Sequence, residues 1–563
     1  MIGYRIVLAL LALALLMSNP ATAGTPAAGG VAKRDSVNSS KAGAIPPLEA
    51  VSVEKNSLSI AVDPRIELLS IVQYLSNYGK THPGLVTGQS HSYRKDTDAW
   101  FTRFKAHPVM EMFNRMSSRG FDYDAPPHFV LCLDADLSLG KTIFKDTYVV
   151  RRARGKKQTV AFADALRAFA VESGFPEFYR NHVPFYKQIT EETAKNVEDK
   201  DVIRELELYY GEKKGSCTAV ISPLLGGGCF GCTIRSQAGT EDTYSIMGSS
   251  GERDGVLLFG SPESFDHLQR HEFGHSFVNP LTEKHHELCG KYSNLFPPMK
   301  EKMQGQAYGE WGTVVNESII RAVTTRLAYR LNGPDAGDKE LRSNTGCGFV
   351  FTGALARKLV EYEQNRGKYP TLDSFYPELL KALDGFSVST VKDLLNTDLT
   401  INGLSREARS VVYEIPDDER RADAVRFIER MHERFFSKLE MIDATKLDDA
   451  ALKDKLKGNF ILYTAMGEKA RLFKATTQSL HIEIDGGTFR WNGVTAPVSD
   501  LRVILVGKNP YGDGNCVVYA AGCNRLLDGI NGVFHGPCAY HVFQGEKLLK
   551  EGFYNEKPVL SNP

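Results

Sequence analysis

The sequence predicts an α+β fold: a large domain with a mixed sheet and one helix that carries a histidine motif, followed by a smaller C-terminal α/β domain. Three features of the chain lead to this prediction. The pattern His-Glu-Phe-Gly-His at residues 271–275 lies in an apolar run with helical spacing. Residues 60–210 alternate helical patterns with short strand patterns. After residue 458, short strand patterns separated by turn residues prevail.

The first 48 residues have the composition of a leader followed by a linker. Arg5, the apolar stretch 6–17 and the small residues 21–23 predict a secretory signal peptide over residues 1–23, too short to stay in a bilayer. Residues 24–48 are rich in Gly, Ala, Ser and Lys, which predicts a disordered linker. No later stretch is apolar enough for an integral membrane span. We therefore expect an exported protein, periplasmic or extracellular.

The charge balance argues against one class of partner. The 563 residues include 68 basic and 68 acidic side chains, so the formal net charge is +0. Without a basic field, no nucleic-acid binding is expected. With 42% hydrophobic residues, the chain can bury more than one core. The sequence does not indicate an oligomeric state.

Residues 49–441 are predicted to form the large domain. Four segments have helical periodicity, at residues 161–171, 202–210, 313–330 and 349–366, and further helices extend to about residue 441. Residues 218–225 and 243–248 have strand patterns that flank a glycine-rich loop at 226–228, which predicts a hairpin. This hairpin is either an ordinary part of the sheet or an edge that receives an extended peptide.

The histidine motif lies on a predicted helix with recognisable ends. Ser261, Pro262 and Glu263 provide an N-cap, a first-turn proline and a first-turn acid. Apolar residues follow at roughly helical spacing, at positions 265, 268, 273 and 277. We expect Asn279-Pro280 to end the helix, because proline does not continue the hydrogen-bond pattern.

The motif has the spacing of a metal site. His271 and His275 are four residues apart, so both imidazoles lie on one face of the helix and can reach a single ion. Such a pair binds Zn²⁺ with a coordination position open for water, and Glu272 is placed to accept the proton of that water. A His267/His271 pair is the competing choice, but it would leave Glu272 and His275 without a role.

The third ligand distinguishes the classes of zinc peptidase. A metzincin has Gly and then His at the third and sixth positions after the second histidine, where this chain has Val278 and Leu281. The other arrangement takes a carboxylate from a second, downstream helix. The candidates for this carboxylate are Glu283, Glu287, Glu301, Glu310 and Glu317.

Glu317 is the predicted third ligand. It is the one carboxylate in the apolar helical run at residues 314–323, where an unpaired charge is costly. An ion pair with Arg321, four residues later, is the alternative. The two are compatible, because an arginine can orient a carboxylate that binds the metal.

Several segments resemble a known family. The resemblance is carried by residues 271–280, 306–309, 311 and 317–322, and by the earlier segments 62–69 and 104–108. They resemble a bacterial family of exported proteins that is catalogued as a domain of unknown function and grouped by its motif with gluzincin-type metallopeptidases. The resemblance covers about residues 50–390.

The resemblance implies a zincin-like metallopeptidase domain, and a secreted or periplasmic zinc-dependent peptidase whose substrates are peptides or proteins. His271, His275 and Glu317 would bind Zn²⁺, and Glu272 would act as the general base. Tyr308, in the Gln-Ala-Tyr-Gly segment, is the candidate donor to the oxyanion, with His286 as the alternative and a buried structural role for Tyr308 also open. The competing function is a non-catalytic envelope binding protein with a structural metal site.

Nine cysteines in an exported chain predict several disulfides and at least one remaining thiol. Cys132 lies in an apolar, strand-like run at residues 129–133 and is the predicted buried thiol. Cys229 and Cys232 predict a disulfide in a glycine-rich loop, with a redox pair or half of a zinc ribbon as alternatives.

A polar helical connector at residues 442–457 is predicted to separate the large domain from the C-terminal domain at 458–563. Strand patterns of the latter cover residues 460–464, 480–484, 488–491, 501–506 and 517–521. His535 has no acidic partner at a motif spacing, and a structural or binding role is expected for it.

Overall fold

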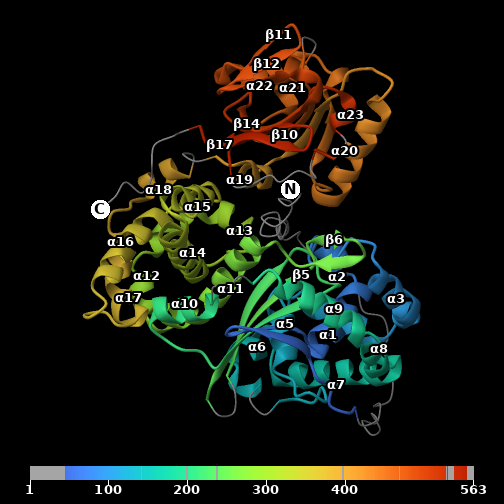
Figure 1. Cartoon of the computed structure of the whole chain (residues 1–563), viewed down its shortest axis with the longest axis vertical. Coiled ribbons are helices and arrows are strands. Elements are labelled where there is room, and N and C mark those ends of the chain that lie inside the picture. Colours follow the sequence, from blue (N-terminus) through green and yellow to red (C-terminus); the bar gives the residue numbers. More distant parts are fainter. Residues whose placement is uncertain are drawn as a thin grey trace, which may run out of the picture. The chain divides into compact units, whose positions relative to one another are not determined.

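The computed structural model describes residues 45–554, except for 141–142, 198–200, 236–238, 396–398, 468–469, 528 and 531–537 (Figure 1). The predicted signal peptide, most of the predicted linker and His535 lie outside the described residues. The fold is of the mixed α+β class, as predicted. Its described part divides into two compact units: an N-terminal unit of residues 45–203 and 214–262, and a C-terminal unit of residues 204–213 and 263–554.

The N-terminal unit is built on a mixed five-stranded sheet with the order β1-β2-β3-β5-β4. The three inner strands are parallel and both edge strands are antiparallel to their neighbours. The strands are β1 (Val51–Lys55), β2 (Leu58–Val62), β3 (Ser216–Ser222), β4 (Cys229–Arg235) and β5 (Glu241–Gly248), with a separate hairpin of β6 (Gly251–Arg253) and β7 (Val256–Leu258). The helices are α1 (Pro64–Leu75), α2 (Tyr78–Thr81), α3 (Ser92–Phe101), α4 (Pro108–Ser117), α5 (Ala125–Leu131), α6 (Thr147–Arg152), α7 (Lys156–Ser173), α8 (Phe175–Asn181) and α9 (Val183–Ala194).

The predicted hairpin of residues 218–225 and 243–248 is wrong in its pairing. These segments form β3 and β5, which are parallel neighbours, and β4 pairs antiparallel with β5 at the edge of the sheet. A Cβ on Gly248 would lie 2.0 Å from the carbonyl oxygen of Gly226, so the loop after β3 passes directly against the end of β5. After β3 the chain passes the position of β5, forms β4 at the edge of the sheet, and then returns to form β5 between them. Strand patterns in the sequence do not encode this order.

Helices dominate the first part of the C-terminal unit, and the predicted helices at 202–210, 313–330 and 349–366 are confirmed. The helices of this part are α10 (Val202–Tyr210), α11 (Pro262–Lys284), α12 (His286–Gly290), α13 (Lys300–Gln304), α14 (Trp311–Asn332), α15 (Pro334–Gly346), α16 (Thr352–Gln364), α17 (Leu372–Leu380) and α18 (Val388–Leu394). Within the described part of the chain, no helix combines the length and apolar character that crossing a bilayer requires.

The prediction that Asn279-Pro280 ends the motif helix is wrong, because α11 continues through Pro280 to Lys284. Proline removes one backbone donor from the helix, but packing of the last turn offsets that loss. The hydroxyls of Thr282 and Tyr376 lie 2.5 Å apart, and Nζ of Lys284 lies 2.7 Å from a carboxylate oxygen of Asp373. Tertiary contacts with α17 therefore extend the helix beyond its sequence signal.

A seven-stranded sheet with the order β17-β16-β14-β15-β10-β8-β9 forms the second part of the C-terminal unit. Phe460 and Leu462 face one core with α21 and α22, and Ile461 and Tyr463 face another with α19, α20 and α23. The strands are β8 (Ser410–Glu414), β9 (Glu440–Asp443), β10 (Phe460–Ala465), β14 (Leu501–Lys508), β15 (Asn515–Ala521), β16 (Tyr540–Gln544) and β17 (Lys547–Gly552). The helices are α19 (Ile401–Arg406), α20 (Arg421–Phe435), α21 (Asp449–Lys455), α22 (Arg471–Thr477) and α23 (Asn524–Leu527).

This sheet begins earlier in the sequence than the predicted C-terminal domain. Strand β8 lies before the predicted connector at 442–457, and β9 overlaps its first residues. Every residue of β8 is buried. Both strands pair in parallel with their neighbours, so the sheet is formed from both sides of the connector. A smaller antiparallel sheet of β11 (Glu483–Asp485), β12 (Thr488–Trp491) and β13 (Val494–Pro497) packs against one face.

The prediction of several disulfides is wrong for the described structure, which includes all nine cysteines and has no disulfide bond among them. Cys229 and Cys232 both lie on β4. An extended strand places such residues on opposite faces and about 10 Å apart, beyond the roughly 7 Å between Cα atoms that a disulfide spans. Cys132 is confirmed as a buried thiol, although it follows helix α5 instead of lying in a strand.

Candidate metal centre

Helices α11 and α14 approach each other closely at the histidine motif. A Cβ on Gly274 would lie 3.1 Å from Cγ2 of Ile320 on α14 and 3.3 Å from the hydroxyl of Tyr210 on α10. A side chain at this position would force the side chains of Ile320 and Tyr210 to shift. Because Glu317 and Ile320 are three residues apart on one face of α14, the contact at Gly274 places Glu317 beside the two histidines.

His271, His275 and Glu317 form one cluster, with their ligand atoms all within 4.8 Å of one another. Nε2 of His271 lies 3.4 Å from Oε2 of Glu317, and Nε2 of His275 lies 3.3 Å from Oε1. A charge-assisted N–H···O bond would be about 2.7–2.9 Å. Two ligands that each lie about 2.05 Å from a tetrahedral zinc are about 3.3 Å apart. The spacing fits a shared metal ion better than direct hydrogen bonds.

The cluster is nearly removed from solvent, and His275 is its most accessible member. The side chains of His271 and Glu317 are 3% and 4% exposed, and that of His275 is 19% exposed. Buried Oε2 of Glu317 has no hydrogen-bond partner among the described residues. The Arg321 guanidinium, 3.2 Å from this oxygen, balances its charge but leaves it able to bind a metal ion. The donor set therefore fits a divalent metal ion.

Burial and the carboxylate act differently on the two imidazoles. Burial lowers the pKa of His271 to about 4, against the opposing charge of Glu317. Burial also acts to lower the pKa of His275, but the adjacent carboxylate of Glu317 outweighs that effect and raises the pKa to about 9. Burial opposes ionisation of Glu317, yet the histidines and Arg321 hold its pKa well below the usual range.

Residues around the cluster fix its geometry. Nδ1 of His275 lies 3.2 Å from Oδ1 of Asn279. Because an amide oxygen only accepts, Nδ1–H is the donor, and this bond orients the ring so that Nε2 faces Glu317. Nη2 of Arg321 lies 3.2 Å from Oε2 of Glu317, and Nη1 donates to Oδ1 of Asn344 at 2.9 Å. The Arg321 guanidinium also lies 4.1 Å from the ring centroid of Phe349. Glu317 therefore belongs to the cluster and also pairs with Arg321, so the two predicted roles of this carboxylate are compatible.

Glu272 and Tyr308 lie near the cluster without belonging to it. Glu272 is buried on α11, and its charge contributes to the raised pKa of His275. One residue of helix rotates it about 100° from His271. Tyr308 packs edge-on against Phe349, with ring centroids 5.5 Å apart. Burial and the charge of Glu317 raise the pKa of Tyr308, against the opposing charge of Arg321.

The other candidate ligands lie elsewhere in the described structure. His267 is 3.9 Å from the carboxylate of Glu340 and outside the cluster. His286, the alternative oxyanion donor, is exposed on α12. The remaining carboxylates are likewise exposed and outside the cluster: Glu283, Glu287, Glu301 and Glu310.

The sequence analysis missed the residues that hold Arg321, and two further groups of side chains whose ligand atoms lie close enough together to hold a metal ion. Asn344 and Phe349 follow α14 in the chain at no motif spacing, and only the fold brings them to Arg321. The further groups are His128 with Cys132 and Asp146, and Cys538 with His541 and Glu551. His128 and Cys132 have an i,i+4 spacing that could have indicated the first group, but Asp146 follows at no motif spacing.

The family described as "Domain of unknown function (DUF4932)" matches residues 58–382, more than half of the chain. The chain belongs to the DUF4932 family. The matched range includes all three cluster residues and Glu272, and it ends before β8. No curated protein and no solved structure matches this DUF4932 chain.

Replacement of Glu317 tests the third position of the cluster. We expect Glu317→Ala to lower the zinc affinity of this DUF4932 protein by at least about tenfold, because one of three protein donors is lost. The exposed Glu310 and Glu283 provide matched controls, and their alanine variants should bind zinc normally. Competition with a chromophoric chelator measures the affinities. A zinc-loaded crystal structure with the Glu317 carboxylate well beyond about 2.2 Å from the metal would refute the assignment.

Enlarging Gly274 tests the helix approach. The valine side chain in Gly274→Val would overlap Ile320 and Tyr210, so we expect a loss of about 1–3 kcal/mol in the free energy of unfolding and weaker zinc binding. Gly312→Val, on α14 where no atom lies within 4 Å of the added Cβ, is the control. Urea unfolding of both variants, with and without zinc, gives the comparison. Equal stability of the two variants would contradict the role of Gly274.

The raised pKa of His275 predicts proton release on zinc binding. At pH 7 the metal-free protein holds a proton on His275, whose pKa is about 9, and none on His271, whose pKa is about 4. Zinc needs neutral imidazole, so binding should release about one proton at this pH, and affinity should rise as the pH approaches 9. Titration calorimetry in buffers of different ionisation enthalpy counts the protons. Glu317→Ala should reduce the count, since the carboxylate is what raises this pKa.

Proposed function

We propose that this DUF4932 protein is an exported, zinc-dependent peptidase of the gluzincin type. One observation carries the proposal: a buried His-His-Glu set with the spacing of metal ligands, on two packed helices, with the carboxylate of Glu272 directly after the first histidine. The leader-like composition of residues 1–23 supports export. A purely structural metal site would need no carboxylate at position 272.

The residues of the centre have separate roles in this proposal. His271, His275 and Glu317 would hold the zinc, which supplies a polarised water and a Lewis acid for the substrate carbonyl when it is bound. Glu272 takes a proton from the water onto its carboxylate and then delivers it to the leaving amine. The partial exposure of His275 provides a side from which water and substrate can approach.

Arg321 and Tyr308 act in this proposal as positioning residues. Arg321 holds Oε2 of Glu317, and stacking on Phe349 and the bond to Asn344 hold Arg321 in turn. Tyr308 contacts the same arginine and the same phenylalanine. These contacts favour a role for Tyr308 in orienting Glu317 over its predicted role as oxyanion donor.

A peptide library tests the proposal. The purified mature protein should contain about one zinc ion per chain and cleave a subset of a mixed-sequence peptide library, and mass spectrometry of the products gives the cleavage preference. Chelation should abolish cleavage and added zinc should restore it. Stoichiometric zinc without any zinc-dependent cleavage would refute the peptidase and favour a non-catalytic envelope protein with a structural metal site.

A further inference from the structure

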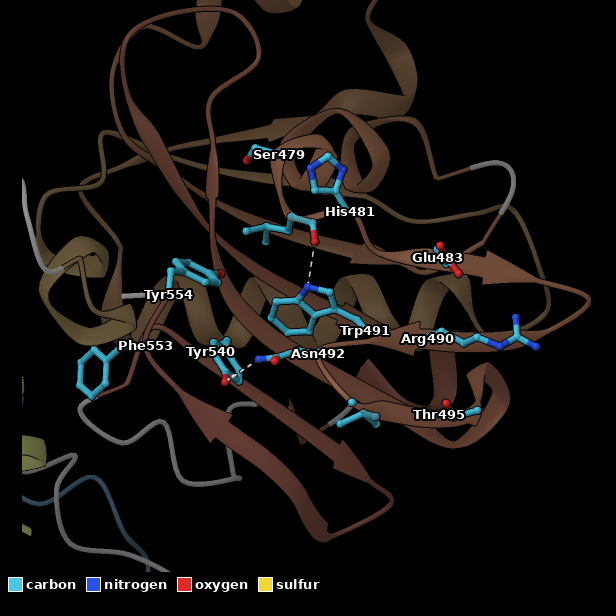
Figure 2. Close-up of a pocket in the computed structure, with 13 residues that line it drawn as sticks. Ser479, His481, Glu483, Arg490, Trp491, Asn492, Thr495, Tyr540, Phe553 and Tyr554 are labelled. Atoms are coloured by element: carbon cyan, nitrogen blue, oxygen red, sulfur yellow. Dashed lines mark hydrogen bonds between the residues drawn. The ribbon is translucent and has the colours of Figure 1, made fainter. Parts of the chain in front are cut away.

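The C-terminal unit contains a cavity that the metal centre does not use, beside the small sheet of β11, β12 and β13 (Figure 2). Its volume of about 700 Å³ lies within the range of small-molecule sites. The lining comes from the 3₁₀ turn at Gln478–Leu480, from the three strands, and from Tyr540, Phe553 and Tyr554. The match to the DUF4932 family ends before all of these residues.

An Asn-Gly turn shapes one wall of the cavity. Asn492 and Gly493 join β12 to β13 with φ values of 49° and 78°, as a two-residue hairpin turn requires. Nζ of Lys550 donates to the carbonyl oxygen of Asn492 at 2.6 Å, and the Asn492 amide donates to the hydroxyl of Tyr540 at 2.7 Å. These bonds fix the turn, and the adjacent Trp491, against β16 and β17.

Three aromatic rings pack together at the cavity: Trp491 and Tyr554 are accessible, and Tyr540 lies buried in contact with both. Ring centroids are 4.9 Å apart for Trp491 and Tyr540, and 5.7 Å apart for Tyr540 and Tyr554. The indole N–H of Trp491 donates to the carbonyl oxygen of Leu480 at 2.9 Å. The hydroxyl of Tyr554 donates to the carbonyl oxygen of Val506 at 2.6 Å. Because main-chain atoms bind their polar groups, these two rings are held in place before a ligand arrives.

Polar side chains complete the lining. His481, Glu483, Arg490 and Thr495 are exposed, and all four belong to the small sheet or to the turn before it (Figure 2). Glu483 and Arg490 are direct cross-strand partners on β11 and β12. The negative charge of Glu483 is therefore balanced by the positive charge of Arg490. The lining offers hydrogen-bond donors and acceptors, but no excess of either charge.

This composition disfavours two ligand classes. A phosphate or nucleic acid needs clustered basic side chains, whereas Arg490 is paired in register with Glu483. A quaternary ammonium ion needs room between aromatic rings, whereas Trp491 and Tyr540 are in edge-on contact. A ligand with an apolar face and a rim of uncharged polar groups matches both parts of the lining.

We infer that this cavity is a binding site for a neutral oligosaccharide, with a pyranose ring against Trp491. The C–H face of a pyranose suits an aromatic surface, and its equatorial hydroxyls suit the amide of Asn492, the hydroxyl of Thr495 and the charged pair at the rim. The site is separate from the cluster on α11 and α14, so binding does not require the metal. It gives the chain an anchor on glycan material.

Binding of defined hexasaccharides tests the inference. The mature full-length protein is titrated calorimetrically with the hexamers of cellulose, chitin and amylose, and at least one should bind. Trp491→Ala should weaken that binding by at least about tenfold, because it removes the ring on which the pyranose packs. Tyr511→Ala is the control, since Tyr511 is an aromatic residue of the same unit outside the cavity and bonds to Asp449. This variant should bind like the parent.

Loss of sugar binding in Trp491→Ala must be distinguished from loss of folding. Circular dichroism and an unchanged zinc content establish that Trp491→Ala remains folded. The softer variant Asn492→Asp, which keeps the size of the turn residue, covers the case in which the alanine variant unfolds, and it too should weaken binding. Failure of all three hexasaccharides to bind at millimolar concentration would overturn the inference. Equal binding by Trp491→Ala, or preference for a trimethyllysine peptide, would also overturn it.

Discussion

Glu272→Gln is expected to retain zinc and thermal stability while peptide hydrolysis falls by roughly 10²–10⁴-fold, the usual loss when a general base is removed. Glutamine keeps the size of the side chain and much of its hydrogen bonding, but it cannot accept the proton of the water. Glu272 lies outside the His-His-Glu cluster, so the ligand set remains complete. Initial rates on the best library peptide, together with zinc content by atomic emission, measure the two quantities.

His271→Ala provides the contrast for this variant. It removes a ligand from a nearly inaccessible position, so both metal and activity should be lost, and stability should fall because ion binding adds to the free energy of folding. The contrast separates chemistry from folding. If Glu272→Gln lost its zinc as completely as His271→Ala, the division into ligands and base would be wrong, and His267 would need to be tested as a ligand.

Arg321→Met should have the largest effect on stability. The arginine is 11% exposed, pairs with Glu317 at 3.2 Å and is bonded to Asn344. Removing the arginine leaves the buried carboxylate of Glu317 with only His275 to balance its charge, and the expected loss is about 3–5 kcal/mol in the free energy of unfolding of the metal-free protein. Zinc affinity should also fall by about 10–100-fold, because Glu317 loses the contact that orients it.

Arg326→Met is the matched control for this loss. Arg326 lies on the same helix and pairs with Glu363 at 2.7 Å, away from the cluster. Its replacement should lower stability and leave zinc affinity unchanged. Denaturant unfolding and chelator competition on both variants distinguish a contribution to the metal centre from a general contribution to packing. Equal zinc affinity in the two variants would show that Arg321 does not position Glu317.

Local rules predicted the central part of the candidate site. Helical periodicity places His271 and His275 on one face, and this follows from their spacing alone. The cost of an unpaired carboxylate in an apolar helix singled out Glu317, and the fold brings it to the two histidines. The long helices α14 and α16 were predicted because their apolar pattern extends over several turns.

Non-local packing decided what these rules missed. The chain order around Gly226 and Gly248 pairs β3 with β5, and contacts with α17 carry α11 through Pro280. Strand β8 was missed because five buried residues are too few to show a period, and its pairing with β10 is what makes it a strand. The extended geometry of β4 keeps Cys229 and Cys232 apart.

The sequence by itself determined which chemical groups this DUF4932 chain has and which of them share a helix face, because side-chain spacing along a helix is fixed by its 3.6-residue period. Only the tertiary structure decided how the helix of Glu317, which the sequence had singled out, comes to lie against the helix of the two histidines. Glu317 reaches the histidines because Gly274 lets α14 approach α11 at Ile320. That register depends on the packing of whole helices, and the same packing supplies Asn344 and Phe349 around Arg321.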